Sequence, residues 1–476
     1  MLVMVERRRS PGVVAFITAS SFLDGVSLGG LRAHLRDTFD ELWIVDLGGE
    51  GRGALAEENV FAIRTPVAIA FGVNRTGGRP ARCRVRYRRI PGTRDEKLDA
   101  VGAWRFDDDG WTDIEGDGLA SLTPRTASEY RSWPEITDLF AWIHPGSKAG
   151  RTWVISASKA VLNRRIVALM EANNRDKRTL FKDSPTGRKV DQSGGRSIMP
   201  GEWDARPVSK LASPPEVKKF GYRSFDVQHI VADPRFIDRP GPGWRVRGLR
   251  QVFLTTLTST KLGAGPAVTA SAYVPDLHHF RGSYGAKDVM PLWLDGRRRR
   301  RPNVPAGLLD VLSAQVGRTV DAEDLAAYVY GLTATGAFTA RFSAELAEAA
   351  GPVHVPLTAD RALFERVVAL GRDLLWWHTW GERFGPKGGA QLPDGSAKVL
   401  EPVRGVPESY RWCASGQLIV GSGVFEPVSE VVWRFGVSGL RVVDSWLGYR
   451  MARRKGKRSS PLDEIGPERW THTPEL

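Results

Sequence analysis

The stretch PGVVAFIT at residues 11–18 decides the fold of the N-terminal part of this chain. Its apolar run from Val13 to Ile17 contains no polar residue, which is typical of a strand that is buried on both faces. A helical stretch from Leu28 to Phe39 and a second apolar run from Leu42 to Leu47 follow it. This order of strand, helix and strand predicts an α/β sheet.

The sheet is expected to extend beyond these three elements. A third strand-like run spans residues 66–73, and strand-like sequence continues to Ile90. An acidic stretch with glycines, residues 107–118, then interrupts the pattern, and a turn at residues 145–147 closes this part. We therefore expect a first domain at residues 1–145.

Residues 146–476 are expected to form an α+β domain with a helical section. A helix is predicted at 159–173, a loop-rich segment at 182–215, and a small mixed sheet from strands at 251–258 and 268–274. Two helices, 321–332 and 360–384, are expected to pack through apolar side chains of the second, namely Leu363, Phe364, Val367, Leu370, Leu374 and Trp377. Residues 418–421 and 431–435 are strand-like.

Stretches along nearly the whole chain resemble one known family. They are GVVAFITASSFLDG (12–25), LRAHL (31–35), FDELWIVDL (39–47), ENVFAI (58–63), SFD (224–226), DPRFIDRP (233–240), YVPDLHHFRGSYG (273–285), the helical stretches 326–342 and 363–384, VFEPV (424–428) and WLGYR (446–450). Together they resemble type ISP restriction-modification enzymes. The resemblance implies the rear of a Rossmann-like adenine-specific DNA methyltransferase sheet at 1–145, followed by an α+β specificity (target recognition) domain at 146–476.

Two features of that family's methyltransferase are not found in this sequence. The family holds S-adenosylmethionine on a glycine-rich loop after the first strand, and holds the target amine with an Asn-Pro-Pro-aromatic motif. The only Pro-Pro pair here, in SPPE (213–216), has neither an amide before it nor an aromatic residue after it. We therefore expect no catalytic residue and no cofactor binding by this chain alone, and expect the front half of the family's domain and a final helix to be missing.

The glycine-rich stretch DLGGEGRG (46–53) follows a strand, as a cofactor loop would. Its glycines do not have the first, third and sixth spacing of the dinucleotide pattern, and no long helix follows them. We favour a surface loop over a cofactor site here.

Composition and charge favour a polyanionic partner. The 476 residues carry 68 Lys and Arg against 54 Asp and Glu, a net charge of +14, although solubility alone would also account for this excess. The two cysteines, Cys83 and Cys413, lie too far apart in sequence to indicate a zinc site. No signal peptide or membrane anchor is predicted, and we expect a cytoplasmic protein.

Several basic segments are candidates for DNA contact. Strand periodicity places Arg82, Arg84, Arg86 and Arg88 on one face, where they could track phosphates or protect a sheet edge from aggregation, and both interpretations stay open. Exposed basic runs include Arg297 and Arg298, and Arg453, Arg454 and Lys455. Base-reading candidates are Arg235, Arg239, His278, His279, Arg281 and Lys287. A metal site on nearby aspartates and histidines is disfavoured, because no established ligand spacing occurs.

The resemblance implies a function in bacterial defence. We expect the sequence-specific DNA-recognition portion of a type ISP adenine methyltransferase, which binds double-stranded DNA but does not methylate it alone. One alternative is half of a split S-adenosylmethionine-dependent methyltransferase, active with a chain that carries the missing half. The other is a decayed, inactive remnant.

Overall fold

The protein is described from a computed structural model. It describes residues 11–49, 57–61, 63, 65–116, 118–124, 128–151, 153–183, 187–193, 199, 206–282, 288–295, 301–348, 351–386, 391–393, 395–405 and 407–451. The chain divides into two compact units. Unit 1 comprises Met1–Trp133, Thr258–Ala264 and Thr339–His354, and unit 2 comprises Pro134–Leu257, Gly265–Phe338 and Val355–Leu476.

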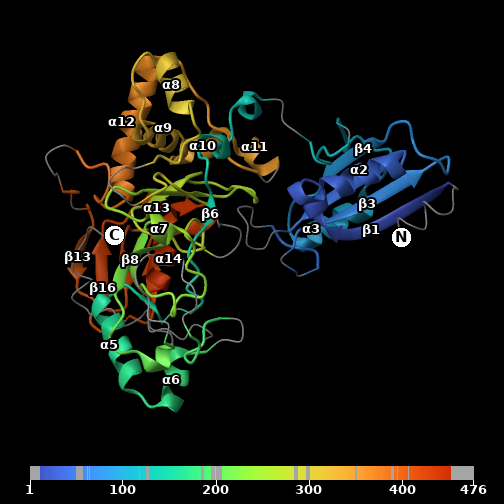
Figure 1. The fold of residues 1–476 in the computed structure, drawn as a ribbon. Coiled ribbons are helices and arrows are strands. Elements are labelled where there is room, and N and C mark those ends of the chain that lie inside the picture. The colour runs from blue at the N-terminus through green and yellow to red at the C-terminus, as the bar shows by residue number, and fades with distance from the viewer. Residues whose placement is uncertain are drawn as a thin grey trace. The chain divides into compact units, whose positions relative to one another are not determined.

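Unit 1 contains a mixed five-stranded sheet in the order β1-β3-β2-β4-β5 (Figure 1). Its strands are β1 (Gly12–Ala19), β2 (Glu41–Gly48), β3 (Val67–Asn74), β4 (Arg84–Arg89) and β5 (Thr112–Ile114). Strand β3 runs antiparallel to both β1 and β2, so β1 and β2 are parallel with β3 between them. Strand β4 is parallel to β2 and antiparallel to β5. The α/β class is confirmed in this coarser form, as a mixed sheet with helices.

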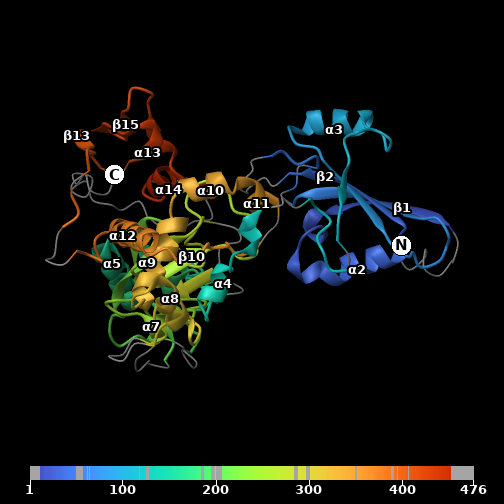
Figure 2. The same cartoon turned by 90° about the horizontal axis from the view of Figure 1, so that it is seen from above.

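Helices cover both faces of this sheet. Figure 2 shows α2 (Gly29–Thr38) on one side of the strands and α3 (Arg94–Ala103) on the other. Leu42 and Ile44 of β2 pack in the cluster that contains Leu35 of α2, whereas Val45 and Leu47 pack in the cluster beneath α3. Strand β2 is therefore buried on both faces, which explains its uninterrupted apolar sequence. The same burial expected for β1 is wrong, because Val13 and Ile17 are 66% and 53% exposed.

Unit 2 is built from short antiparallel sheets. Its sheets have the orders β11-β10-β12-β6, β7-β9-β8, β13-β16-β15-β14 and β17-β18. The strands are β6 (His144–Pro145), β7 (Ile155–Ser156), β8 (Val217–Arg223), β9 (Asp226–Val231), β10 (Phe253–Thr256), β11 (Thr269–Ser271), β12 (Asp288–Pro291), β13 (Lys398–Glu401), β14 (Tyr410–Trp412), β15 (Leu418–Val420), β16 (Gly423–Glu426), β17 (Gly436–Val437) and β18 (Leu440–Arg441). One core joins the first two sheets to α5 (Lys159–Glu171) and α6 (Asn174–Phe181), and a second core lies behind β13–β16.

The remaining helices include the expected long pair. They are α4 (Ile136–Leu139), α7 (Gly243–Val246), α8 (Leu308–Val316), α9 (Ala322–Thr333), α10 (Gly336–Arg341), α11 (Ser343–Glu348), α12 (Arg361–His378), α13 (Glu430–Arg434) and α14 (Val442–Gly448), with 3-10 helices η1 (Ser20–Phe22), η2 (Val26–Leu28), η3 (Glu129–Ser132) and η4 (Val208–Lys210). Both long helices, α9 and α12, occur where the sequence predicts them, except that α12 ends at His378 and not at Phe384.

The face through which α12 packs differs from the expected one. A Cβ atom at Gly371 would lie only 1.7 Å from the carbonyl oxygen of Ala327, so α9 and α12 approach each other closely at small residues. The buried side of α12 consequently centres on Phe364, Val368 and Leu375. Three residues that were expected in the core lie outside this buried side and are 40–47% exposed: Leu363, Leu370 and Trp377. The prediction that they pack in the core is therefore wrong.

Residues 430–434 form helix α13, so the strand expected at 431–435 is also wrong. Ser429 precedes the helix, and its hydroxyl accepts a hydrogen bond from the backbone N–H of Val432. This N-cap overrides the strand preference of the valines, and Val431 remains 79% exposed.

Candidate nucleic-acid interface

The arginines of β4 lie on one face of their strand, as the alternation predicts. Val85 and Tyr87 point into the core, whereas Arg84, Arg86 and Arg88 lie on the other face. Arg82 is exposed and precedes the strand. Strand β4 is flanked by β2 and β5, so it is not a sheet edge.

Acidic residues already pair with these guanidinium groups. Asp113 lies 2.8 Å from Arg84 and 3.4 Å from Arg86, and Asp108 pairs with Arg88. The hydrogen bond from Arg88 lowers the pKa of Asp108 to about 2. A phosphate would have to displace these carboxylates, so the row is less available than its sequence suggests. Its role in DNA contact stays a prediction.

Four of the base-reading candidates are buried or partly buried in unit 2. Arg235 is 7% exposed and donates to both carboxylate oxygens of Asp233, at 2.7 Å and 3.0 Å. Arg281 is 5% exposed and His279 3%, and His278 is half-buried. These side chains support the frame of the domain in this structure.

Arg239 is the exposed residue among the described base-reading candidates. Its backbone pairs with that of Lys148. The sixth base-reading candidate, Lys287, lies outside the described residues, and so do the five candidates of the basic runs: Arg297, Arg298, Arg453, Arg454 and Lys455. All of these candidates stay predictions.

Two buried ion pairs connect distant segments of unit 2. Arg223 at the end of β8 lies 2.7 Å from Asp276, and Arg450 after α14 lies 2.9 Å from Asp226. All four side chains are less than 10% exposed. Beside them, the pKa of His279 is lowered to about 3 by burial and then by the charge of Arg223. Sequence reasoning made neither arginine a site candidate, although Arg450 ends the WLGYR motif, because their partners are remote in the chain.

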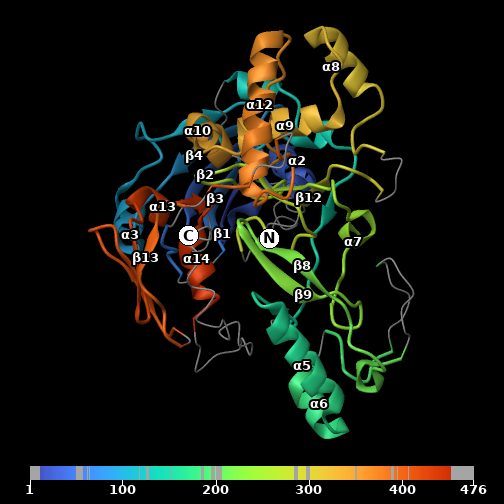
Figure 3. The same cartoon turned by 90° about the vertical axis from the view of Figure 1, so that its left-hand side faces the viewer.

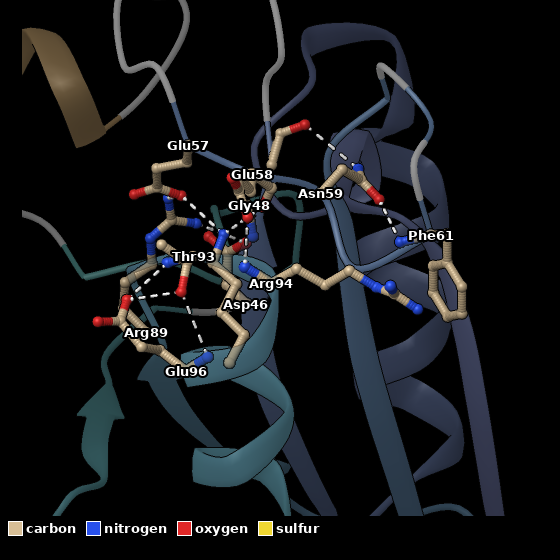
Figure 4. Close-up of polar contacts among 12 residues, drawn as sticks. Asp46, Gly48, Glu57, Glu58, Asn59, Phe61, Arg89, Thr93, Arg94 and Glu96 are labelled. Carbon is tan, nitrogen blue, oxygen red and sulfur yellow. Dashed lines mark hydrogen bonds and ion pairs between the residues drawn. The ribbon is translucent and has the colours of Figure 1, made fainter.

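A polar cluster closes the adjacent ends of β2 and β4 in unit 1 (Figure 4). The Arg89 guanidinium lies 2.8 Å from Asp46 and 2.6 Å from Glu57. Asp46 also accepts hydrogen bonds from the hydroxyl of Tyr87 and the backbone N–H of Gly48. Lys97, which is fully buried, lies 3.4 Å from the same Glu57 carboxylate. The charges balance within the cluster, which indicates a structural role.

The start of the glycine-rich loop does not fit a cofactor. A Cβ atom at Gly48 would lie 2.4 Å from both Arg89 Nη2 and Glu57 Oε2, and one at Gly49 would lie 2.7 Å from the Cα of Asn59. The protein's own side chains thus fill the space that a phosphate or cofactor cradle would leave open.

The described part of the chain has neither a metal-binding cluster nor a membrane-spanning helix. Its His, Cys, Asp and Glu side chains include no group of three that could hold a metal ion. None of its helices is both long enough and apolar enough to cross a membrane.

Comparisons with known proteins give the chain its family. The model of the type ISP C-terminal specificity domain matches residues 138–476, which is more than half of the chain. No curated protein matches the chain.

Solved structures share the fold. The ATP-dependent type ISP restriction-modification enzyme LlaBIII bound to DNA is 17% identical with a TM-score of 0.69, over 98% of this chain and 32% of that chain. A nuclease-deletion mutant of the type ISP enzyme LlaGI with a DNA substrate mimic is 18% identical with a TM-score of 0.66, over 96% and 37%. A DrdV–DNA complex is 16% identical with a TM-score of 0.65, over 97% and 48%. The present chain therefore spans less than half of each of these chains. By its match over residues 138–476, the chain belongs to the type ISP C-terminal specificity domain family.

Proposed function

We propose that this chain is the DNA-recognition portion of a type ISP restriction-modification adenine methyltransferase. It binds duplex DNA at a specific sequence and does not methylate it alone. The family match over residues 138–476 carries this proposal. Further support comes from similar structures that contain DNA and from the chain's net charge of +14.

The geometry of unit 2 suits recognition rather than chemistry. Buried Arg–Asp pairs fix the loops around β8 and β9, and a fixed frame is what base-reading side chains require. In an intact enzyme, a part not contained in this sequence would hold S-adenosylmethionine and receive the flipped adenine. This chain would choose the site.

Unit 1 is, in this proposal, the rear of the methyltransferase sheet. The parallel β1 and β2, joined through α2, and the helices on both faces support a Rossmann-like origin. We place the change to the specificity domain near residue 145, as the sequence predicts.

A selection experiment tests the proposal. The purified chain is incubated with random-sequence duplexes at two salt concentrations, and the bound pool is sequenced. We expect one enriched motif that persists at the higher salt. Binding that vanishes with salt and enriches nothing would refute sequence recognition, because phosphate contacts alone behave in that way.

A second candidate function, half of a split methyltransferase, is favoured by the outer edge of unit 1. Strand β1 pairs only with β3 among the described strands, and Val13 and Ile17 on it are 66% and 53% exposed. A cavity of about 240 Å³ lies beside it, lined in part by Phe16, Phe22, Leu28, Leu31 and Leu35. An apolar strand with an open edge is suited to pair with another strand.

The partner would carry a glycine-rich loop and an Asn-Pro-Pro-Tyr motif. Mixing such a chain with this one should produce adenine methylation, and Val13→Lys with Ile17→Lys should abolish it. The control Leu363→Lys, on the exposed side of α12, should not. Persistent aggregation of the purified wild-type chain would instead favour the decayed remnant.

A further inference from the structure

Helices α5 and α6 of unit 2 form a strongly basic arm, defined here as Lys159–Lys182. Figures 1 and 3 show the two helices, one following the other, at one end of unit 2, beyond β8 and β9. The arm carries seven Lys and Arg residues but only two carboxylates, Glu171 and Asp176. Five of the basic residues are exposed: Lys159, Arg164, Arg175, Arg178 and Lys182.

The packing of the arm explains why its charges face outward. Helix α5 buries Val161, Leu162, Ile166 and Leu169, and α6 buries Phe181. The ring of Phe181 lies in an aromatic cluster with Trp153 and Phe236. These contacts hold both helices on the domain core, so the basic side chains lie on a rigid surface.

Two of these charges have surroundings that disfavour a cation. Lys159 is the first residue of α5, where the helix dipole favours an acidic side chain, and its first turn has none. Burial and then the charge of Arg165 lower the pKa of Lys182, the C-cap residue of α6. A polyanionic partner would offset both effects, because it favours the charged form of each lysine.

The end of α6 that contains Phe181 lies close to the backbone of Arg239, one of the base-reading candidates. Arg151 lies over the ring of Phe181 at 4.3 Å and pairs with Asp238 at 3.3 Å. Arg239 follows directly, and its side chain is exposed. The backbone of Arg239 therefore lies next to the Arg151–Asp238 pair that adjoins Phe181, and its exposed side chain adds a positive charge near this end of the arm.

We propose that the α5–α6 arm, together with Arg239, grips the phosphate backbone of duplex DNA and positions the domain without reading bases. This inference rests on the proposed function and adds the surface that holds the duplex. Helix α5 has 13 residues and is therefore about 20 Å long, enough to follow several phosphates. A lipid surface would need a broad apolar face, whereas the arm exposes two large apolar side chains, Val167 and Leu180.

The test removes three charges from this surface in the full chain. The arm variant is Lys159→Gln, Arg175→Gln and Arg239→Gln, because no described carboxylate pairs with these side chains. The control variant removes three exposed arginines of unit 2 outside the arm, which likewise pair with no described carboxylate: Arg366→Gln, Arg404→Gln and Arg411→Gln. Both variants have the same net charge, and thermal unfolding checks that each is folded.

The readout is the slope of log K for duplex binding against log salt concentration. Each lost phosphate contact should reduce that slope by about 0.9, so the arm variant should lose about 2.7 and the control almost nothing. The motif enriched from the random pool should not change. An unchanged slope, or an equal loss in the control, would refute phosphate contact by the arm but would not bear on sequence recognition. Absence of any wild-type binding would overturn both.

Discussion

Acid should destabilise unit 2 through the buried imidazole of His279. The side chain is 3% exposed, and its Nδ1 lies 3.0 Å from the hydroxyl of Thr255. Its pKa is lowered from 6.5 to about 3 by burial and then by Arg223. The unfolded chain therefore binds a proton at this group between about pH 6.5 and pH 3, and the folded chain does not. Stability must fall as pH decreases through that window.

The magnitude follows from the two pKa values. Between pH 7.5 and pH 5.0, linkage gives a loss of about 2 kcal/mol in the free energy of unfolding from this one group. His378, whose pKa is lowered to about 4 by burial, adds a similar loss of about 2 kcal/mol. A total of about 4 kcal/mol is a large share of the stability of a typical domain.

Urea unfolding at pH 7.5 and 5.0, followed by tryptophan fluorescence, measures this loss. In His279→Asn the amide can replace Nδ1 beside Thr255, but no proton can bind. The variant will be less stable at both pH values, yet its loss between them should be smaller than the wild type's by about 2 kcal/mol. The control His34→Asn, at an exposed position on α2, should behave as wild type. Equal losses in wild type and His279→Asn would refute the reasoning.

Three further predictions concern packing, pairing and reactivity. Gly371→Ala should lower the free energy of unfolding by about 1–3 kcal/mol or more, measured in urea, because its Cβ would meet the carbonyl of Ala327. Asp226→Asn should cost about 3–5 kcal/mol, because Arg450 is left buried without its charged partner, whereas replacing both with Leu and Met should cost much less in the same assay. Burial raises the pKa of the Cys83 thiol to about 12, so alkylation at pH 8, followed by mass spectrometry, should be at least about tenfold slower in the folded chain than in urea. Equal alkylation rates would contradict this burial.

Local patterns predicted the elements better than their pairing. The apolar runs of β1 and β2 and the periodicity of α9 and α12 identify these elements, because each signal lies within one element. The insertion of β3 between β1 and β2 depends on contacts between distant residues, which no local pattern encodes. The packing face of α12 similarly depends on how closely α9 approaches Gly371.

The candidate site shows the same division. Alternation on β4 correctly separates its arginines from Val85 and Tyr87. It cannot reveal that Asp108 and Asp113, from the following loop and strand, form ion pairs with them. For Arg235 a local signal existed, since Asp233 lies two residues earlier, but only the fold shows that both are buried.

The segments that carry the family resemblance meet inside unit 2. The motifs at residues 224–226, 273–285 and 446–450 contribute Asp226, Asp276 and Arg450 to the two buried ion pairs. Breaking such a buried ion pair is strongly destabilising, so these charged side chains cannot leave their partners to contact DNA while the domain stays folded. A family of specificity domains with different target sequences would need a common frame and variable exposed residues. If the chain recognises DNA as proposed, its base-reading side chains should lie on the surface around this network, and its phosphate contacts on basic elements such as α5 and α6.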